Sequence, residues 1–222
     1  DVTMMDSDEL KHRVKDVYAT QNRAVTQQDY ESFIYQMPPR FGSIKRCRIM
    51  RDNDSLKRNL NLYVVSEGFQ GVLVKTNDIL KKNVKTWIQK NKMINDTIDI
   101  LDAKFINLGI EFVAVGSMEK SKFDVLESAK RALITRFRRL PDIGEPFFIT
   151  DVYKELRNVE GVVDVTDVKI SLKSSSDGGR NYSQTSLELG KLTSPDGRYI
   201  QLPKNVMYEV KYPNFDIKGV IV

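Results

Sequence analysis

Apolar and polar residues follow two different periods along this chain. Apolar side chains recur at helical spacing in five stretches, which predicts helices over about residues 7–20, 26–37, 77–92, 121–139 and 150–159. Between them lie runs rich in β-branched residues, which predict strands over residues 44–49, 61–66, 105–115 and 161–170. Helices and strands alternate through most of the sequence.

Several residues mark where these elements begin and end. Thr26 and Asp29 have the spacing of a helix start, and Asn77 is a good N-cap for the next helix. Thr150 is the predicted N-cap of the short helix that follows. The apolar positions of the strand over residues 161–170 change phase near Thr166, which indicates a β-bulge.

The composition changes after the Ser- and Gly-rich stretch that begins at residue 174. The remaining residues favour strands and turns, including a hairpin between residues 185–191 and 198–202 and two short strands broken at Pro213. We therefore predict an α+β fold: mixed α/β units with helices packed on open sheets, followed by a β-rich C-terminal arm. The expected segments are a helical entry with the first helix-strand unit (1–60), a central α/β domain (61–173) and the arm (174–222). Either the arm adds strands to a neighbouring protein or it folds back as an edge sheet.

One pattern occurs twice. A helix that begins near Thr26 and contains Tyr30 leads through a glycine to a strand, and Thr150 and Tyr153 begin a similar series. We therefore expect Tyr30 and Tyr153 to be buried at corresponding places near the starts of two helices.

Charge is unevenly distributed. Lys and Arg number 35 against 30 Asp and Glu. Residues 40–58, 75–92 and 120–139 each hold five more basic than acidic side chains, so the rest of the chain is acidic. Such basic stretches suit nucleic acid, an acidic protein partner, or simply the solvated faces of helices.

The sequence offers little for catalysis. It has a single histidine, His12, and a single cysteine, Cys47, which leaves no histidine triad, thiol zinc site or internal disulfide. Its glycines match no nucleotide-binding motif. The acidic run through Asp96, Asp99 and Asp102 has no EF-hand order, and a carboxylate hydrolase is the least favoured reading. No apolar run reaches the roughly 18 residues of a membrane-spanning helix. We predict no catalytic residue, metal, cofactor or small-molecule substrate.

Several short sequence motifs resemble those of one protein family. Residues 22–31 (NRAVTQQDYE) are similar to the RAVTxxDYE segment of baseplate J-like proteins, which are wedge components of contractile bacteriophage tails. Residues 143–153 and 159–165 resemble that family's GxPFxxSxIY and VxGVxxV stretches, in the same order, and the motifs at residues 202–203 and 219–222 also fit. The sequence departs from the family's shorter pattern in its Lys-rich segment 81–92 and in a long insertion over residues 173–198.

The resemblance implies a structural, non-enzymatic role in a virion. In such wedges, copies associate in pairs and with other wedge proteins, and six wedges close into a ring around the tail hub. The implied partners are thus a second copy of the chain and other baseplate wedge proteins, assembled in the host cytoplasm, with no membrane contact. The alternative is a nucleic-acid-binding module that uses the Lys-rich helix 77–92. Aromatic residues are enriched at interfaces, so the candidate contact residues are Trp87, Tyr208, Tyr212 and Phe215, although Trp87 also fits the core.

Overall fold

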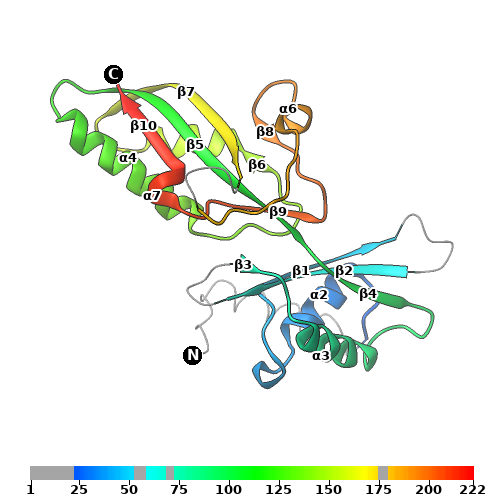
Figure 1. Cartoon of the computed structure of the whole chain (residues 1–222). Helices are drawn as coiled ribbons and strands as arrows, with labels where there is room; N and C mark the ends of the chain where they lie inside the picture. Colours follow the sequence, from blue (N-terminus) through cyan, green and yellow to red (C-terminus); the bar gives the residue numbers. More distant parts are fainter. Residues whose placement is uncertain (1–22, 53–58, 69–72, 175–179) are drawn as a thin grey trace. The chain divides into compact units, whose positions relative to one another are not determined.

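The computed structural model describes residues 23–52, 59–68, 73–174 and 180–222, and the predicted helix over residues 7–20 lies outside them. The chain divides into two compact units between Ala103 and Lys104. Both units combine helices with sheets (Figure 1), which confirms the predicted α+β class.

Unit 1 is a sheet covered by two helices on one face (Figure 1). The central strand β2 pairs antiparallel with β1 and β3 and parallel with β4. The elements in chain order are α2 (Gln27–Tyr35), the 3₁₀ turn η1 (Pro39–Phe41), β1 (Arg46–Arg51), β2 (Asn59–Glu67), β3 (Leu73–Val74), α3 (Asp78–Gln89) and β4 (Thr97–Asp102).

Side chains from both layers form the core of unit 1. Ile49 of β1 and Leu62 of β2 lie in one buried cluster with Phe33 of α2 and Val84 of α3. The predicted start of α2 is confirmed, because Thr26 and Asp29 form a complete capping box. The side chain of Asn77 caps α3, also as predicted.

Unit 2 is built around one long strand, β5. β5 pairs antiparallel with β7, parallel with β9 near its beginning and parallel with β10 near its end. The elements are β5 (Lys104–Gly116), α4 (Lys122–Phe137), β6 (Phe147–Phe148), α5 (Ile149–Arg157), β7 (Val162–Lys173), α6 (Leu189–Leu192), β8 (Tyr199–Ile200), β9 (Val206–Glu209), α7 (Pro213–Asp216) and β10 (Ile217–Ile221).

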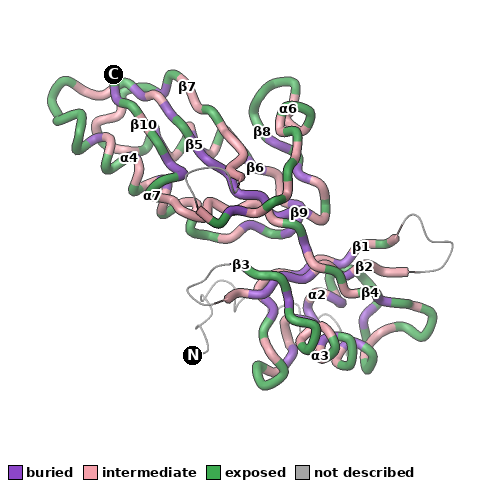
Figure 2. Tube along the Cα trace, viewed as in Figure 1, coloured by how far each residue is buried: buried purple, intermediate pink, exposed green. Residues whose placement is uncertain are grey.

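The helices α4 and α5 pack on the strands β10 and β7 and on each other. They share a buried cluster with β5, which contributes Ile110, Phe112 and Ala114. Buried residues alternate with more exposed ones along β10 and the second half of β5 (Figure 2), as expected where a sheet has one covered face, whereas residues 106–110 of β5 are all buried. In β7 the register skips Thr166, which confirms the predicted bulge.

The predicted C-terminal arm folds back onto unit 2. β9 and β10 both pair with β5, so the folding-back alternative is the one observed. The predicted segment boundary at residue 60 falls inside β2, and residues 180–222 belong to the same compact unit as β5. The compact units therefore follow the partners of β2 and β5 instead of the local change in composition.

Two local predictions are wrong. Residues 185–188 form no strand and α6 follows them, so the first strand of the predicted hairpin is absent. The predicted turn between Ser194 and Gly197 does form, with an antiparallel bridge between Thr193 and Ile200 beside it. Thr150 is not the N-cap of α5, which begins one residue earlier. The N–H groups of Ile149 and Thr150 donate instead to the carbonyl oxygen of Arg198, at 2.9 and 3.4 Å.

The two helix-strand segments of the predicted repeat lie in different units. In each unit the helix packs on the strand that follows it, α2 on β1 and α5 on β7, and that strand runs antiparallel to the central one. Tyr30 is 2% exposed, whereas Tyr153 is half-buried against the core of unit 2. The expected burial is confirmed for Tyr30 and holds in part for Tyr153.

Candidate protein interface

Side chains that commonly bind metals do not gather in the described part of the chain. They contain no group of three or more His, Cys, Asp or Glu side chains that could hold an ion. Cys47 is buried in unit 1, and its backbone N–H donates to the Tyr35 hydroxyl at 3.0 Å. His12 lies outside the described residues. No described helix is long and apolar enough to cross a membrane.

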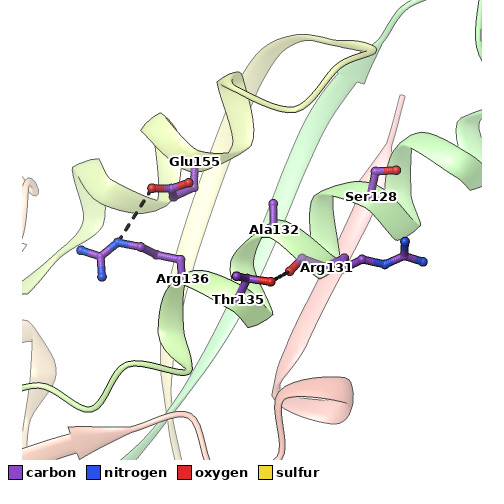
Figure 3. A pocket seen from close by; sticks show the side chains of 6 residues that line it. All are labelled: Ser128, Arg131, Ala132, Thr135, Arg136 and Glu155. Atoms are coloured by element: carbon purple, nitrogen blue, oxygen red, sulfur yellow. Dashed lines mark hydrogen bonds and ion pairs between the residues drawn. The ribbon is translucent and has the colours of Figure 1, made fainter. Parts of the chain in front are cut away.

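A hollow of about 530 Å³ lies beside α4 and α5 (Figure 3). Its side chains are held by local contacts: Arg136 forms ion pairs with Asp151 at 2.6 Å and with Glu155 at 3.8 Å. The Thr135 hydroxyl donates to the carbonyl oxygen of Arg131 in the same helix. The Thr135 hydroxyl and the Glu155 carboxylate therefore have partners other than each other, and none of the four predicted interface residues lines the hollow. It is lined by Ser128, Arg131, Ala132, Thr135, Arg136 and Glu155.

Trp87 is placed as a core residue of unit 1. Its ring is half-buried against the cluster beneath the sheet, and its indole N–H donates to the carbonyl oxygen of Phe33 at 2.7 Å. A buried indole whose N–H has a partner stabilises helix packing. Its contact role stays a prediction.

Tyr208 is turned toward the core of unit 2. Its ring packs edge-on against Phe147 at 5.1 Å, and Phe147 in turn stacks on Phe137 at 5.4 Å. Burial, together with the nearby Glu145 carboxylate, raises the pKa of the Tyr208 hydroxyl well above its ordinary value.

The structure brings Tyr212 and Phe215 together. The Arg180 guanidinium lies 3.6 Å from the centre of the Phe215 ring and 6.0 Å from that of Tyr212. Phe215 is 54% exposed, so its ring combines a cation on one side with solvent contact. We call this group the Arg180–Phe215 cluster; it consists of Arg180, Tyr182, Lys211, Tyr212, Phe215 and Asp216.

A buried carboxylate organises the cluster from below. Asp216 is 1% exposed and accepts a hydrogen bond from the Tyr182 hydroxyl at 2.6 Å and one from the Tyr212 N–H at 2.8 Å. Burial and the Asp216 carboxylate raise the pKa of Tyr182 to about 12, so Tyr182 remains a donor at neutral pH. The rings of Tyr182 and Tyr212 meet edge to face at 5.4 Å. The aromatic surface is therefore held in a fixed arrangement.

Sequence reasoning missed Arg180, Tyr182 and Asp216. They lie up to 36 residues apart, and only the return of α7 to the segment after residue 179 brings them together. The two half-buried cations of the cluster, Arg180 and Lys211, favour an acidic or aromatic partner surface. Lys211 is itself tied to the segment, because its amino group donates to the carbonyl oxygen of Asn181 at 2.5 Å.

The Lys-rich helix α3 stands among acidic side chains. Lys81 forms ion pairs with Asp102 at 2.8 Å and with Asp78 at 3.8 Å. A hollow of about 400 Å³ beside the helix is lined by Asp52 and Asp99 as well as by lysines. A nucleic-acid surface is usually a uniform basic stripe, and this one is mixed.

Comparison with known proteins shows a likeness at the level of the fold. No protein-family model matches the chain, and no curated protein matches it. Among solved structures the fold is similar to that of a chain in the cryo-EM structure of the anti-feeding prophage (AFP) baseplate, 6-fold symmetrised, with a TM-score of 0.54 and 10% sequence identity. The likeness covers 92% of this chain and 41% of the other, so this chain spans less than half the length of its structural neighbour. The shared property is the fold.

Proposed function

We propose that this chain is a structural, non-catalytic part of a phage-tail-like baseplate and that it acts through contacts with other proteins. The observation that carries the proposal is the fold, which matches a chain of the AFP baseplate over nearly the whole length described. The sequence motifs that resemble those of baseplate J-like proteins also support the proposal, independently of the fold.

The proposal extends to a particular place in the assembly. The amino-acid sequence most resembles the C-terminal part of the T-even-like baseplate wedge protein, gene product six. By that resemblance the chain joins neighbouring wedges of a contractile tail into a ring around the hub, pairs with a second copy, and resides in the virion.

The Arg180–Phe215 cluster is the contact surface we favour. Phe215 is exposed, Arg180 fixes its ring, and a buried carboxylate holds the segment in place, so little conformational entropy is lost when a partner binds. Exposed and rigid aromatic groups of this kind are typical binding hot spots. The cluster would meet an acidic or aromatic surface of a neighbouring wedge protein.

The test is to follow the chain in the particles that its own source produces. An affinity tag on the chain should co-purify tail-like particles, and gold-labelled antibody against the tag should mark the baseplate end. Replacing Phe215 by Asp should lower incorporation, whereas Ile94→Asp, at a 97% exposed site in unit 1, should not. A tag found only on free protein, with no particles bound, contradicts the proposal.

The alternative function, nucleic-acid binding, predicts a different experimental result. A chain that binds through α3 would show affinity for duplex or single-stranded DNA that falls steeply with salt, and Lys82→Glu with Lys85→Glu would abolish it. We expect no such binding, because acidic side chains stand beside those lysines.

A further inference from the structure

Near the end of β5 the sheet of unit 2 has one face covered by helices and one exposed face. Along β5, residues Ile110, Phe112 and Ala114 are buried against the helices. Side chains alternate along a strand, so Val113 and Val115 point to the opposite face. Val115 is 38% exposed.

The strand β10 extends the open face with two further valines. Val220 is opposite Val113 in the register, and Val222 continues the pairing because its N–H donates to Ala114 and its carbonyl accepts from Gly116. Val220 is 58% exposed and Val222 63%. The four adjacent residues Val113, Val115, Val220 and Val222 are called the valine face. An exposed apolar patch of adjacent side chains marks an interaction site more often than scattered ones do.

The outer edge of β10 has no strand beside it among the described residues. Among the described strands β10 pairs only with β5. The backbone groups of Val222 point toward β5, and the direction alternates along a strand, so those of Gly219 and Ile221 point outward. An outward row of N–H and C=O groups is a template for another strand.

The opposite edge of the sheet is protected. In β7 the register shifts twice, at Thr166 and again at Val163, and bulges of this kind interrupt edge-to-edge pairing. Asp164 and Asp167 place charges on that strand. The contrast makes β10 the edge that can accept a partner.

The charges around the valine face are already compensated. Lys218 stands opposite Glu111 across the pair of strands, Asp164 bonds Arg157 at 2.9 Å, and Asp167 lies 3.4 Å from Lys169. The described charges around this face thus occur in pairs of opposite sign, which favours an electrically neutral, apolar occupant over a strongly acidic or basic one.

We propose that β10 and the valine face accept an uncharged, extended segment of another polypeptide, which adds a strand to the sheet at Gly219 and Ile221. Its backbone would pair with the outer edge of β10, and its alternate apolar side chains would continue the valine face. The inference rests on unit 2 alone and holds whether or not the chain belongs to a baseplate.

The probe is an acetylated, amidated hexapeptide of alternating threonine and valine, titrated into the ¹⁵N-labelled full chain and followed by NMR. The amide signals of Gly219 and Ile221 should shift, because their N–H groups gain acceptors. An analogue that is N-methylated at every residue keeps the side chains and lacks the backbone donors, so it should not bind. Val220→Lys should weaken binding about tenfold by removing one buried valine contact.

Controls separate strand addition from unspecific adhesion. Ile79→Lys, at a 67% exposed site in unit 1, should leave the titration unchanged. The Val220→Lys chain should keep the wild-type spectrum outside β10 and its neighbours, which shows that it folds. Equal binding of the N-methylated analogue, shifts elsewhere than β10, or no shift at millimolar peptide each overturns the proposal.

Discussion

The contact between β10 and β5 at Gly219 leads to a sharp prediction. In the parallel pairing of β10 with β5, Gly219 is opposite Phe112, whose ring lies across the glycine. A Cβ added at Gly219 would stand 2.2 Å from one ring carbon and 2.6 Å from two others. Phe112 is 2% exposed and belongs to the core cluster, so the ring has no free space to move into. We therefore expect Gly219→Ala to destabilise the protein.

The magnitude follows from two opposing terms. Forcing one extra methyl into a packed core costs about 1–3 kcal/mol. Alanine is favoured over glycine within a strand by roughly 0.5–1 kcal/mol, since it loses less backbone entropy on folding. The difference between the two ranges is roughly 0–2.5 kcal/mol, and its midpoint predicts a net loss of unfolding free energy of about 1 kcal/mol.

Urea unfolding followed by far-ultraviolet circular dichroism measures this loss as a lower midpoint at unchanged slope. The matched control is Gly190→Ala in α6, where nothing lies within 4 Å of the added Cβ, and which should be neutral or stabilising by up to about 1 kcal/mol. In a Phe112→Leu background the cost of Gly219→Ala should shrink, because the ring has been removed. A Gly219→Ala protein as stable as wild type, or an unchanged cost in the Phe112→Leu background, refutes the reasoning.

Three further predictions concern polar side chains. Thr26→Ala should cost about 1 kcal/mol in urea unfolding by removing the cap of α2. Burial works against ionisation of Asp29, yet hydrogen bonds from the N–H groups of the same cap lower the pKa of its carboxyl group overall. The ionised Asp29 therefore stabilises the fold above pH 3.8, and this contribution is lost as the pH falls through the folded-state pKa. Tyr182→Phe should cost roughly 1.5–3 kcal/mol by leaving the Asp216 carboxylate short of a donor, and a variant of wild-type stability would contradict this. Burial raises the pKa of Glu209, so Glu209→Gln should stabilise the chain at pH 7, and its advantage should vanish below pH 4.5 in a pH series of unfolding curves.

Elements defined by their own residues were predictable from the sequence. The caps at Thr26 and Asn77 depend on side chains within three residues of the helix start, and the phase change at Thr166 is visible in the strand itself. Local patterns are sufficient there because the interactions that decide the structure are local.

Elements defined by distant residues were not predictable. The start of α5 was misplaced because its first N–H groups are capped by the carbonyl oxygen of Arg198, far along the chain. Residues 185–188 have strand propensity, but the Ser183 N–H just before them is held by the Asn107 side chain at 2.7 Å, and β8 pairs with β6 instead. Tertiary contacts override propensity at both places.

The sequence indicated only part of the Arg180–Phe215 cluster as a candidate interface. Tyr212 and Phe215 lie close together in sequence, and the structure adds Arg180 and Tyr182 to them. Aromatic type alone cannot separate an interface residue from a core residue, which is why Trp87 and Tyr208 stood beside them. The hydrogen bond of Trp87 and the ring contacts of Tyr208 appear only after folding.

Strand β5 pairs with other strands on both of its sides, and this affects how the protein folds during synthesis. Residues 110–114 find their parallel neighbour only in residues 217–221, more than a hundred positions later. A ribosome must therefore synthesise nearly all of unit 2 before β5 has a partner on that side, and closing so long a loop is slow. Until then the nascent strand presents apolar side chains to the cytosol, so we expect this half of the chain to depend on chaperones during synthesis and to aggregate when translation stops before residue 217.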